Sequence, residues 1–153
     1  MRMNLKKWLA EGRIQPHHTT KQEIANLFKV VDRDMKDANL EGLSEDRRFA
    51  TAYNAALQLA TIVLYASGYR SKAATGHHWV TLMSLPELMG QKTTQRTDYL
   101  NTCRSKRNMA DYDTAGTISA AELKVLIKEV VSFKHDVILW LQKHHPEYVL
   151  NQQ

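Results

Sequence analysis

The sequence predicts an all-α fold, an antiparallel four-helix bundle with short accessory helices. Three observations support this prediction: apolar residues recur at helical spacing over most of the chain, only three prolines interrupt its 153 residues, and no segment alternates between apolar and polar residues for long enough to form a strand. Hydrophobic residues make up 43% of the chain and charged residues 24%, which is typical of a soluble globular protein. We therefore expect a single helical domain over residues 1–153.

The chain is expected to begin with an accessory part and to end in a loose tail. Leu5, Trp8 and Leu9 share one helical face, and Gly12 ends this short helix. Residues 1–18 then form the accessory helix and its connector, residues 19–145 the bundle, and residues 146–153 the tail. No apolar core of signal-peptide length follows the basic N-terminal residues, and the most apolar run, Ala55 to Ala66, is far shorter than a membrane span. We therefore expect a cytoplasmic protein without a membrane partner.

The first two bundle helices have recognisable starts and ends. Thr20 and Glu23 match a capping box and predict a helix to about Ala38. Ser44 is suited to cap the next helix, which Gly68 ends. This second helix is apolar around most of its circumference, so either it is central to the bundle or another subunit covers one side. The charged segments 32–37 and 46–48 are expected to form ion pairs between the two helices, in preference to an acidic catalytic group.

The second half of the bundle is less regular at first. Residues 69–76 are expected to form a loop, and residues 77–89 one or two short helical turns before Gly90. A helix should follow from about Thr94 to Asp111. Ser119 and Glu122 form a second capping box and begin the last helix. The single cysteine, Cys103, excludes an intramolecular disulfide, and its position on an apolar helix face predicts a packing role.

The densest polar cluster lies at the end of the 94–111 helix. At about 100° per residue, its members share one side of that helix: Arg104, Arg107, Asn108, Asp111 and Tyr112. Arginine together with amide and phenol groups offers directed donors for a phosphate or an RNA backbone. The formal net charge of +5 also favours an anionic partner. The same i to i+4 spacing is found on solvated helix faces, so a purely structural role stays open.

Together, the Ala-rich segment 48–60, the residues Ser67–Tyr69 and Gly76–His78, and the helix ending at residues 104–113 resemble HEPN-domain proteins over roughly residues 20–142. The resemblance implies an α-helical homodimer in which the polar clusters of both subunits face a shared cleft. Many members are metal-independent ribonucleases, several of them toxins encoded with a minimal nucleotidyltransferase, whereas others are noncatalytic binding modules. A nucleotidyltransferase-type protein is therefore an expected partner.

Active members carry an Arg, usually a polar residue such as Asn, and a His a few residues later. Arg107 and Asn108 match the first two residues of this motif. Tyr112 stands at the position where the resemblance implies a His, and the next histidine in the chain is His135. If the protein cleaves RNA, Arg107 would stabilise transition-state charge, Asn108 would position the phosphate, and Tyr112 would orient the substrate or assist proton transfer.

Four further residues are expected to bind substrate. Arg104 would contact it directly, and Asp111 would hold an arginine in place. Either His77 or His78, near a helix start, could reach the Arg107 cluster and supply the titratable group that the motif lacks.

No cofactor or metal is expected. The three His-His pairs, at 17–18, 77–78 and 144–145, diverge by about 100° on a helix, and no metal-ligand spacing accompanies them. The sequence thus favours a protein that binds RNA or a nucleotide and has possible ribonuclease activity. The alternatives are a noncatalytic homodimeric module that binds a protein partner, and a structural bundle without a small ligand.

Overall fold

The structure is a computed structural model, and it describes residues 3–72, 76–112 and 116–149, with side chains over the same ranges apart from residues 3 and 109–112. Helices account for 78% of the described residues, so the prediction of a predominantly α-helical protein is confirmed. The α-helices, in chain order, are α1 (Met3–Ala10), α2 (Lys21–Ala38), α3 (Glu45–Ala66), α4 (His77–Met89), α5 (Thr94–Tyr112) and α6 (Ala120–His144). Two short 3-10 helices, η1 (Gln91–Thr93) and η2 (Pro146–Tyr148), follow α4 and α6.

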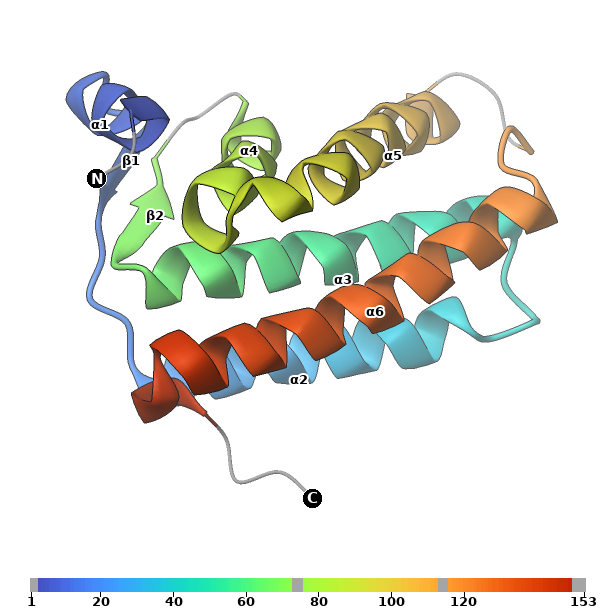
Figure 1. Cartoon of the computed structure of the whole chain (residues 1–153). Helices are drawn as coiled ribbons and strands as arrows, with labels where there is room; N and C mark the ends of the chain where they lie inside the picture. Colours follow the sequence, from blue (N-terminus) through green and yellow to red (C-terminus); the bar gives the residue numbers. More distant parts are fainter. Residues whose placement is uncertain (1–2, 73–75, 113–115, 150–153) are drawn as a thin grey trace.

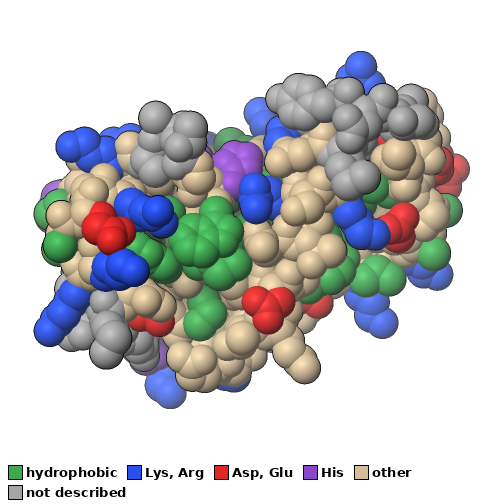
Figure 2. Space-filling view, turned by 90° about the horizontal axis from the view of Figure 1, so that it is seen from above, with side chains coloured by type: hydrophobic (Ala, Val, Ile, Leu, Met, Phe, Trp, Pro, Cys, Tyr) green, Lys and Arg blue, Asp and Glu red, His purple; other side chains and the backbone are tan. Residues whose placement is uncertain are grey.

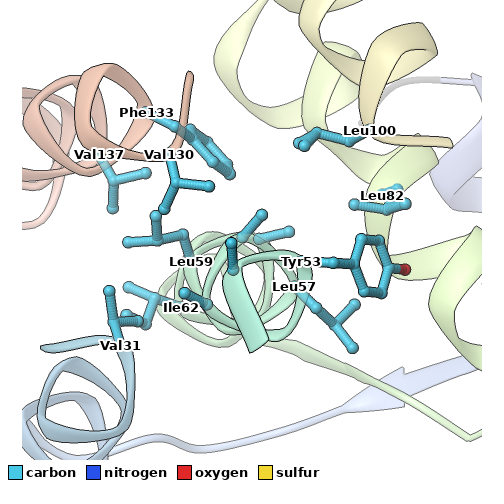
Figure 3. Packing of buried hydrophobic residues seen from close by; sticks show 14 of the residues in the cluster. Val31, Tyr53, Leu57, Leu59, Ile62, Leu82, Leu100, Val130, Phe133 and Val137 are labelled. Carbon is cyan, nitrogen blue, oxygen red and sulfur yellow. The ribbon is translucent and has the colours of Figure 1, made fainter. Parts of the chain in front are cut away.

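Helix α3 is the centre of the fold. Helices α2, α4, α5 and α6 all pack against it (Figure 1). Figure 3 shows Val31 of α2, Leu82 of α4, Leu100 of α5 and Phe133 of α6 arranged around the α3 side chains. The described part of the chain therefore covers α3 by itself, and no second subunit is needed for this purpose.

By length and composition alone, α3 could also cross a membrane. Its most apolar window, however, is 67% buried inside the protein. A helix covered in this way by its own chain has the burial of the core helix of a soluble protein.

A second, smaller core joins α1 to α4. Leu5 and Trp8 of α1 are buried together with Ile14 and Val80. The rings of Trp8 and Trp79 meet edge to face, with centroids 5.9 Å apart. This cluster fixes the accessory helix beside the start of α4, as Figure 1 shows.

The structure corrects the prediction that the chain has no strand. Strands β1 (Ile14–Pro16) and β2 (Tyr69–Ser71) pair antiparallel, with Ile14 opposite Ser71 and Pro16 opposite Tyr69. Three residues are too few to show an alternating pattern, and the pairing depends on contact between segments far apart in sequence. Part of the expected 69–76 loop is therefore β2.

The N-terminal caps agree with the sequence, with one exception. Ser119 and Glu122 form the complete capping box of α6, and Ser44 accepts a hydrogen bond from the Arg47 amide at the start of α3. At α2 only half of the predicted box is present: the Thr20 hydroxyl accepts from the Glu23 amide at 3.1 Å. The Glu23 carboxylate instead contacts the side chains of Thr19 and His17.

Two other local predictions are wrong. Residues 77–89 form one continuous helix, α4, because burial of Val80, Leu82 and Leu85 outweighs the weak helical pattern and Pro86. The tail that was expected to be loose from residue 146 begins with η2, and Tyr148 packs against the main core. Residues 150–153 lie outside the described residues.

Hydrogen bonds replace the ion pairs that were predicted between α2 and α3. The buried Asp34 carboxylate accepts a hydrogen bond of 2.7 Å from the Asn54 amide, and Arg48 donates to the Ala38 carbonyl at 2.7 Å. Asp46 accepts from the backbone amides of Gly116 and Ile118, which precede α6. Within the described ranges, no ion pair joins the 32–37 and 46–48 segments.

Candidate functional site

The candidate site lies where α3, α4 and α5 meet. The second half of α5 carries Arg104, Arg107 and Asn108, and the first turn of α4 carries His77 and His78. The Asp111 and Tyr112 side chains, which were also predicted to belong to the site, lie outside the described residues. The structure thus brings the histidines near the arginines, although α4 and α5 are separate helices.

Tyr53 of α3 connects these two groups. Its side chain is only 1% exposed, and Figure 3 shows the hydroxyl pointing away from the α3 axis. The hydroxyl oxygen is 3.3 Å from Nδ1 of His78, and the two rings lie 5.9 Å apart. A buried tyrosine hydroxyl requires a hydrogen-bond partner, and His78 provides it.

The arginines approach Tyr53 from α5. The Arg107 guanidinium carbon lies 5.9 Å from the centroid of the Tyr53 ring, a cation–π arrangement. Arg107 also donates to Asn108 Oδ1 at 3.3 Å, and Arg104 Nε donates to Asn101 Oδ1 at 3.0 Å. These contacts orient both guanidinium groups along the face that α5 shares with α4.

The surroundings of His78 favour its neutral form. Burial lowers the pKa of His78, and the nearby charges of His77, Arg107 and Arg104 lower it further. Burial raises the pKa of Tyr53, which the two arginines only partly offset, so the phenol stays protonated at neutral pH. A neutral imidazole has one nitrogen able to accept a proton, and in this site it stands beside two permanent positive charges.

The site is open to solvent. His77 is exposed, and His78, Arg104, Arg107 and Asn108 are partly exposed. On the face of the molecule shown in Figure 2, histidine and basic side chains lie next to each other. Two hollows, of about 640 Å³ and about 450 Å³, lie elsewhere and are lined by none of these five residues.

Sequence reasoning did not single out Tyr53, which belongs to the helix that was described only as apolar around most of its circumference. One signal was available: a tyrosine within a helix that is apolar on nearly every side must place its hydroxyl against a polar group. The sequence could not indicate which group, because Tyr53 and His78 meet only through the packing of α3 against α4.

The other histidine pairs have separate surroundings. His17 Nε2 lies 2.6 Å from the Glu23 carboxylate, and its ring packs against Tyr65. His144 and His145 both pack against Trp140. Among the side chains that the structure describes, no three His, Cys, Asp or Glu groups are arranged to hold a metal ion.

Cys103 lies one helical turn before Arg107 on α5 and is packed into the main core. It is 1% exposed and forms no disulfide, in agreement with the predicted packing role. Burial raises the pKa of its thiol, which disfavours the reactive thiolate.

Comparison of the chain with known protein families, with curated proteins and with solved structures finds no match. The candidate site is therefore defined by its own geometry.

Proposed function

We propose that this chain is a cytoplasmic RNA-binding protein with a HEPN-like four-helix bundle, and that it cleaves RNA without a metal ion. One observation carries the proposal: His78 lies near Arg104 and Arg107, with the ring of Tyr53 in contact with both His78 and Arg107. The pKa of His78 is lowered, so its imidazole is neutral more readily than that of a free histidine. This arrangement supplies a proton acceptor and two groups that bind phosphate, which are the components needed for transesterification of RNA.

The openness of the site favours RNA over a free nucleotide. Small ligands are usually held in hollows that bury most of their surface, whereas Arg104, Arg107 and Asn108 lie on an open helix face. Single-stranded RNA can extend along such a face and contact several donors at once. The net charge of +5 adds a general attraction for its backbone.

In the proposed reaction, His78 donates its Nδ1–H to the Tyr53 hydroxyl oxygen, which leaves Nε2 free to take the proton from a ribose 2′-hydroxyl. The 2′-oxygen then attacks the adjacent phosphorus atom, and the bond to the 5′-oxygen of the next nucleotide breaks. The leaving oxygen takes a proton from solvent, so the products are a 2′,3′-cyclic phosphate and a 5′-hydroxyl. Arg104 and Arg107 stabilise the negative charge that gathers on the phosphate, and Asn108 positions it. His78 thus takes the role that the HEPN motif gives to a His at the position of Tyr112, which would orient the substrate.

The test is to incubate the purified protein with mixed RNA in the presence of EDTA and to measure binding and cleavage separately. Arg107→Ala should weaken binding roughly tenfold or more, because it removes a charged hydrogen-bond donor. His78→Gln should retain binding but lower the cleavage rate by roughly a hundredfold or more. Lys124→Ala is the matched control, because this exposed lysine of α6 lies outside the site. If Arg107→Ala binds and cleaves RNA as well as the Lys124→Ala control, the proposal is wrong.

A noncatalytic homodimeric module is the second candidate, and exposed apolar residues on α6 favour it. Val125, Val131 and Leu139 are at least half exposed, at 56%, 60% and 50%. Such residues can form the contact with a second copy or with a nucleotidyltransferase-type partner. Light scattering and the RNA-binding assay together distinguish the two candidates. The noncatalytic module requires that the protein is a dimer, that Leu139→Lys dissociates this dimer, and that the protein binds no RNA.

A further inference from the structure

A groove separate from the candidate site lies between α1, α4 and the start of α5. It has a volume of about 450 Å³, and Trp8, Trp79, Glu87, Thr97 and Asp98 are among the residues that line it. On the face of the molecule shown in Figure 2, exposed hydrophobic side chains form a patch that has both acidic and basic side chains around it. The volume is within the range of roughly 300–1,000 Å³ that is usual for small-ligand sites.

Acidic groups slightly outnumber basic ones in this groove, although the chain as a whole is basic. Glu11, Glu87 and Asp98 line it together with only two cations, Lys7 and Arg13. Arg13 already pairs with Glu11 at 3.5 Å. Glu87 and Asp98, by contrast, make no ion pair with any residue that the structure describes. A ligand that carries phosphate would be repelled from these two carboxylates, whereas a cation would be attracted.

Two residues that line the groove each carry a buried oxygen atom without a hydrogen-bond partner. Thr97 is only 1% exposed, and its hydroxyl has no partner within the described ranges. The Oε1 atom of Glu87 is also buried without a partner, while its Oε2 accepts a hydrogen bond of 3.4 Å from Asn4. Buried polar atoms in folded proteins are nearly always hydrogen-bonded. A ligand ammonium group carries three N–H donors and could therefore satisfy an acceptor on each residue.

The aromatic side chains of the groove are also suited to a cation. The guanidinium carbon of Arg13 lies 5.8 Å from the ring centroid of Trp79, so this ring already attracts a positive charge. The Trp8 ring stands edge-on to the Trp79 ring and adds apolar surface. Aromatic rings of this kind can cover the methylene groups of an alkyl chain while carboxylates bind its charged ends.

We propose that this groove binds a small organic cation with primary ammonium groups, of the size of an alkyl diamine. Glu87 and Asp98 supply the opposite charge, Thr97 and Glu87 accept the N–H hydrogen bonds, and Trp79 covers the alkyl chain. The groove is independent of the proposed RNA site, because the two sites share no residue.

The experiment is a titration of tryptophan fluorescence with 1,5-diaminopentane, using 1,5-pentanediol as the uncharged probe of similar shape. The chain has three tryptophans, so Trp140→Phe is made first to leave only Trp8 and Trp79, both at the groove. We expect a saturable change with the diamine and none with the diol.

Two variants and one matched control locate the binding. Glu87→Gln and Asp98→Asn should each weaken diamine binding roughly tenfold or more, because each removes a charged acceptor. Glu41→Gln makes the same charge change at an exposed residue outside the groove and should bind normally. Circular dichroism of every variant checks that the helices are intact, and the two groove variants can be judged separately if one fails to fold. A missing response in the parent protein, or equal affinity in the groove variants and the Glu41→Gln control, would overturn the proposal.

Discussion

The hydrogen bond between Asn54 and Asp34 provides the sharpest test of how the fold positions the candidate site. Asp34 is 5% exposed, and its Oδ2 accepts from Asn54 Nδ2 at 2.7 Å, while Arg33 contacts Oδ1. Asn54 follows Tyr53 in α3, so its contact with α2 fixes the rotation that places the Tyr53 hydroxyl against His78.

Replacing Asn54 with Ala removes the donor and leaves a buried carboxylate oxygen unpaired. Loss of a hydrogen bond to a charged group costs about 1.5–3 kcal/mol. Alanine is the better helix former by about 0.5 kcal/mol, which offsets part of this loss. The free energy of unfolding should therefore fall by about 1–2.5 kcal/mol, and the urea midpoint by roughly 1 M at an unchanged slope.

The matched control is Gln22→Ala, which breaks a hydrogen bond of 2.9 Å to Asn26 on the exposed face of α2. It should cost only about 0.2–0.5 kcal/mol. Adding Asp34→Asn to the Asn54→Ala variant neutralises the unpaired carboxylate, so the double variant should lose less stability than the two single changes summed. Urea unfolding followed by circular dichroism measures the parent protein, the three single variants (Asn54→Ala, Asp34→Asn and Gln22→Ala) and the double variant. If Asn54→Ala costs no more than Gln22→Ala, the argument that this contact holds α3 against α2 is refuted.

Three further predictions concern the candidate site and its surroundings. Tyr53→Phe removes only the hydroxyl that contacts His78, so it should lower the free energy of unfolding by about 1 kcal/mol; an unchanged urea midpoint would contradict the hydrogen bond. The lowered pKa of His78 means that the folded protein binds its proton less readily than the unfolded chain does. His78 therefore contributes stability above the pKa of about 6.5 that it has in the unfolded chain, and this contribution is lost as the pH falls below that value. His78→Gln removes the titrating group, so urea unfolding should show a smaller loss of stability between pH 7.5 and pH 5 in this variant than in the parent protein. Cys103 is 1% exposed, and burial raises the pKa of its thiol. In the folded protein the thiol should therefore react with a disulfide reagent far more slowly than in the protein unfolded by urea. Equal rates would contradict the packing of Cys103 into the core.

The helices could be predicted well because their signals are local. The caps Thr20, Ser44 and Ser119 each depend on residues within a few positions of one another, and they placed the helix starts correctly. Helix α4 was harder, because it packs against α1, α3 and α5 and therefore buries residues on several faces. Its periodicity is weak for this reason, and tertiary packing decides its length.

The candidate site could be predicted only in part. Arg104, Arg107 and Asn108 follow one another on a single helix, so their shared face was evident from spacing. The contact of His78 with Tyr53 joins residues that are 25 positions apart, and it depends on the packing of two helices. The ion pairs expected between α2 and α3 were wrong for the same reason, because the partners are set by helix packing. The positions of charged residues in the sequence did not reveal that Asp34 would accept from the Asn54 amide or that Arg48 would donate to the Ala38 carbonyl.

The short pairing of β1 with β2 is expected to form late in folding and to unfold before the helices that it joins. The strands lie on either side of the α2–α3 pair in sequence, and these two helices return the chain to the end where it started (Figure 1). Once α2 and α3 have packed, the strand ends are already close, so joining them loses little chain entropy. The strand pair and α1 depend on only a small core and should open without unfolding the rest. Amide hydrogen exchange should therefore be faster at Trp8 and Arg70 than at Leu59 and Val63 in the middle of α3.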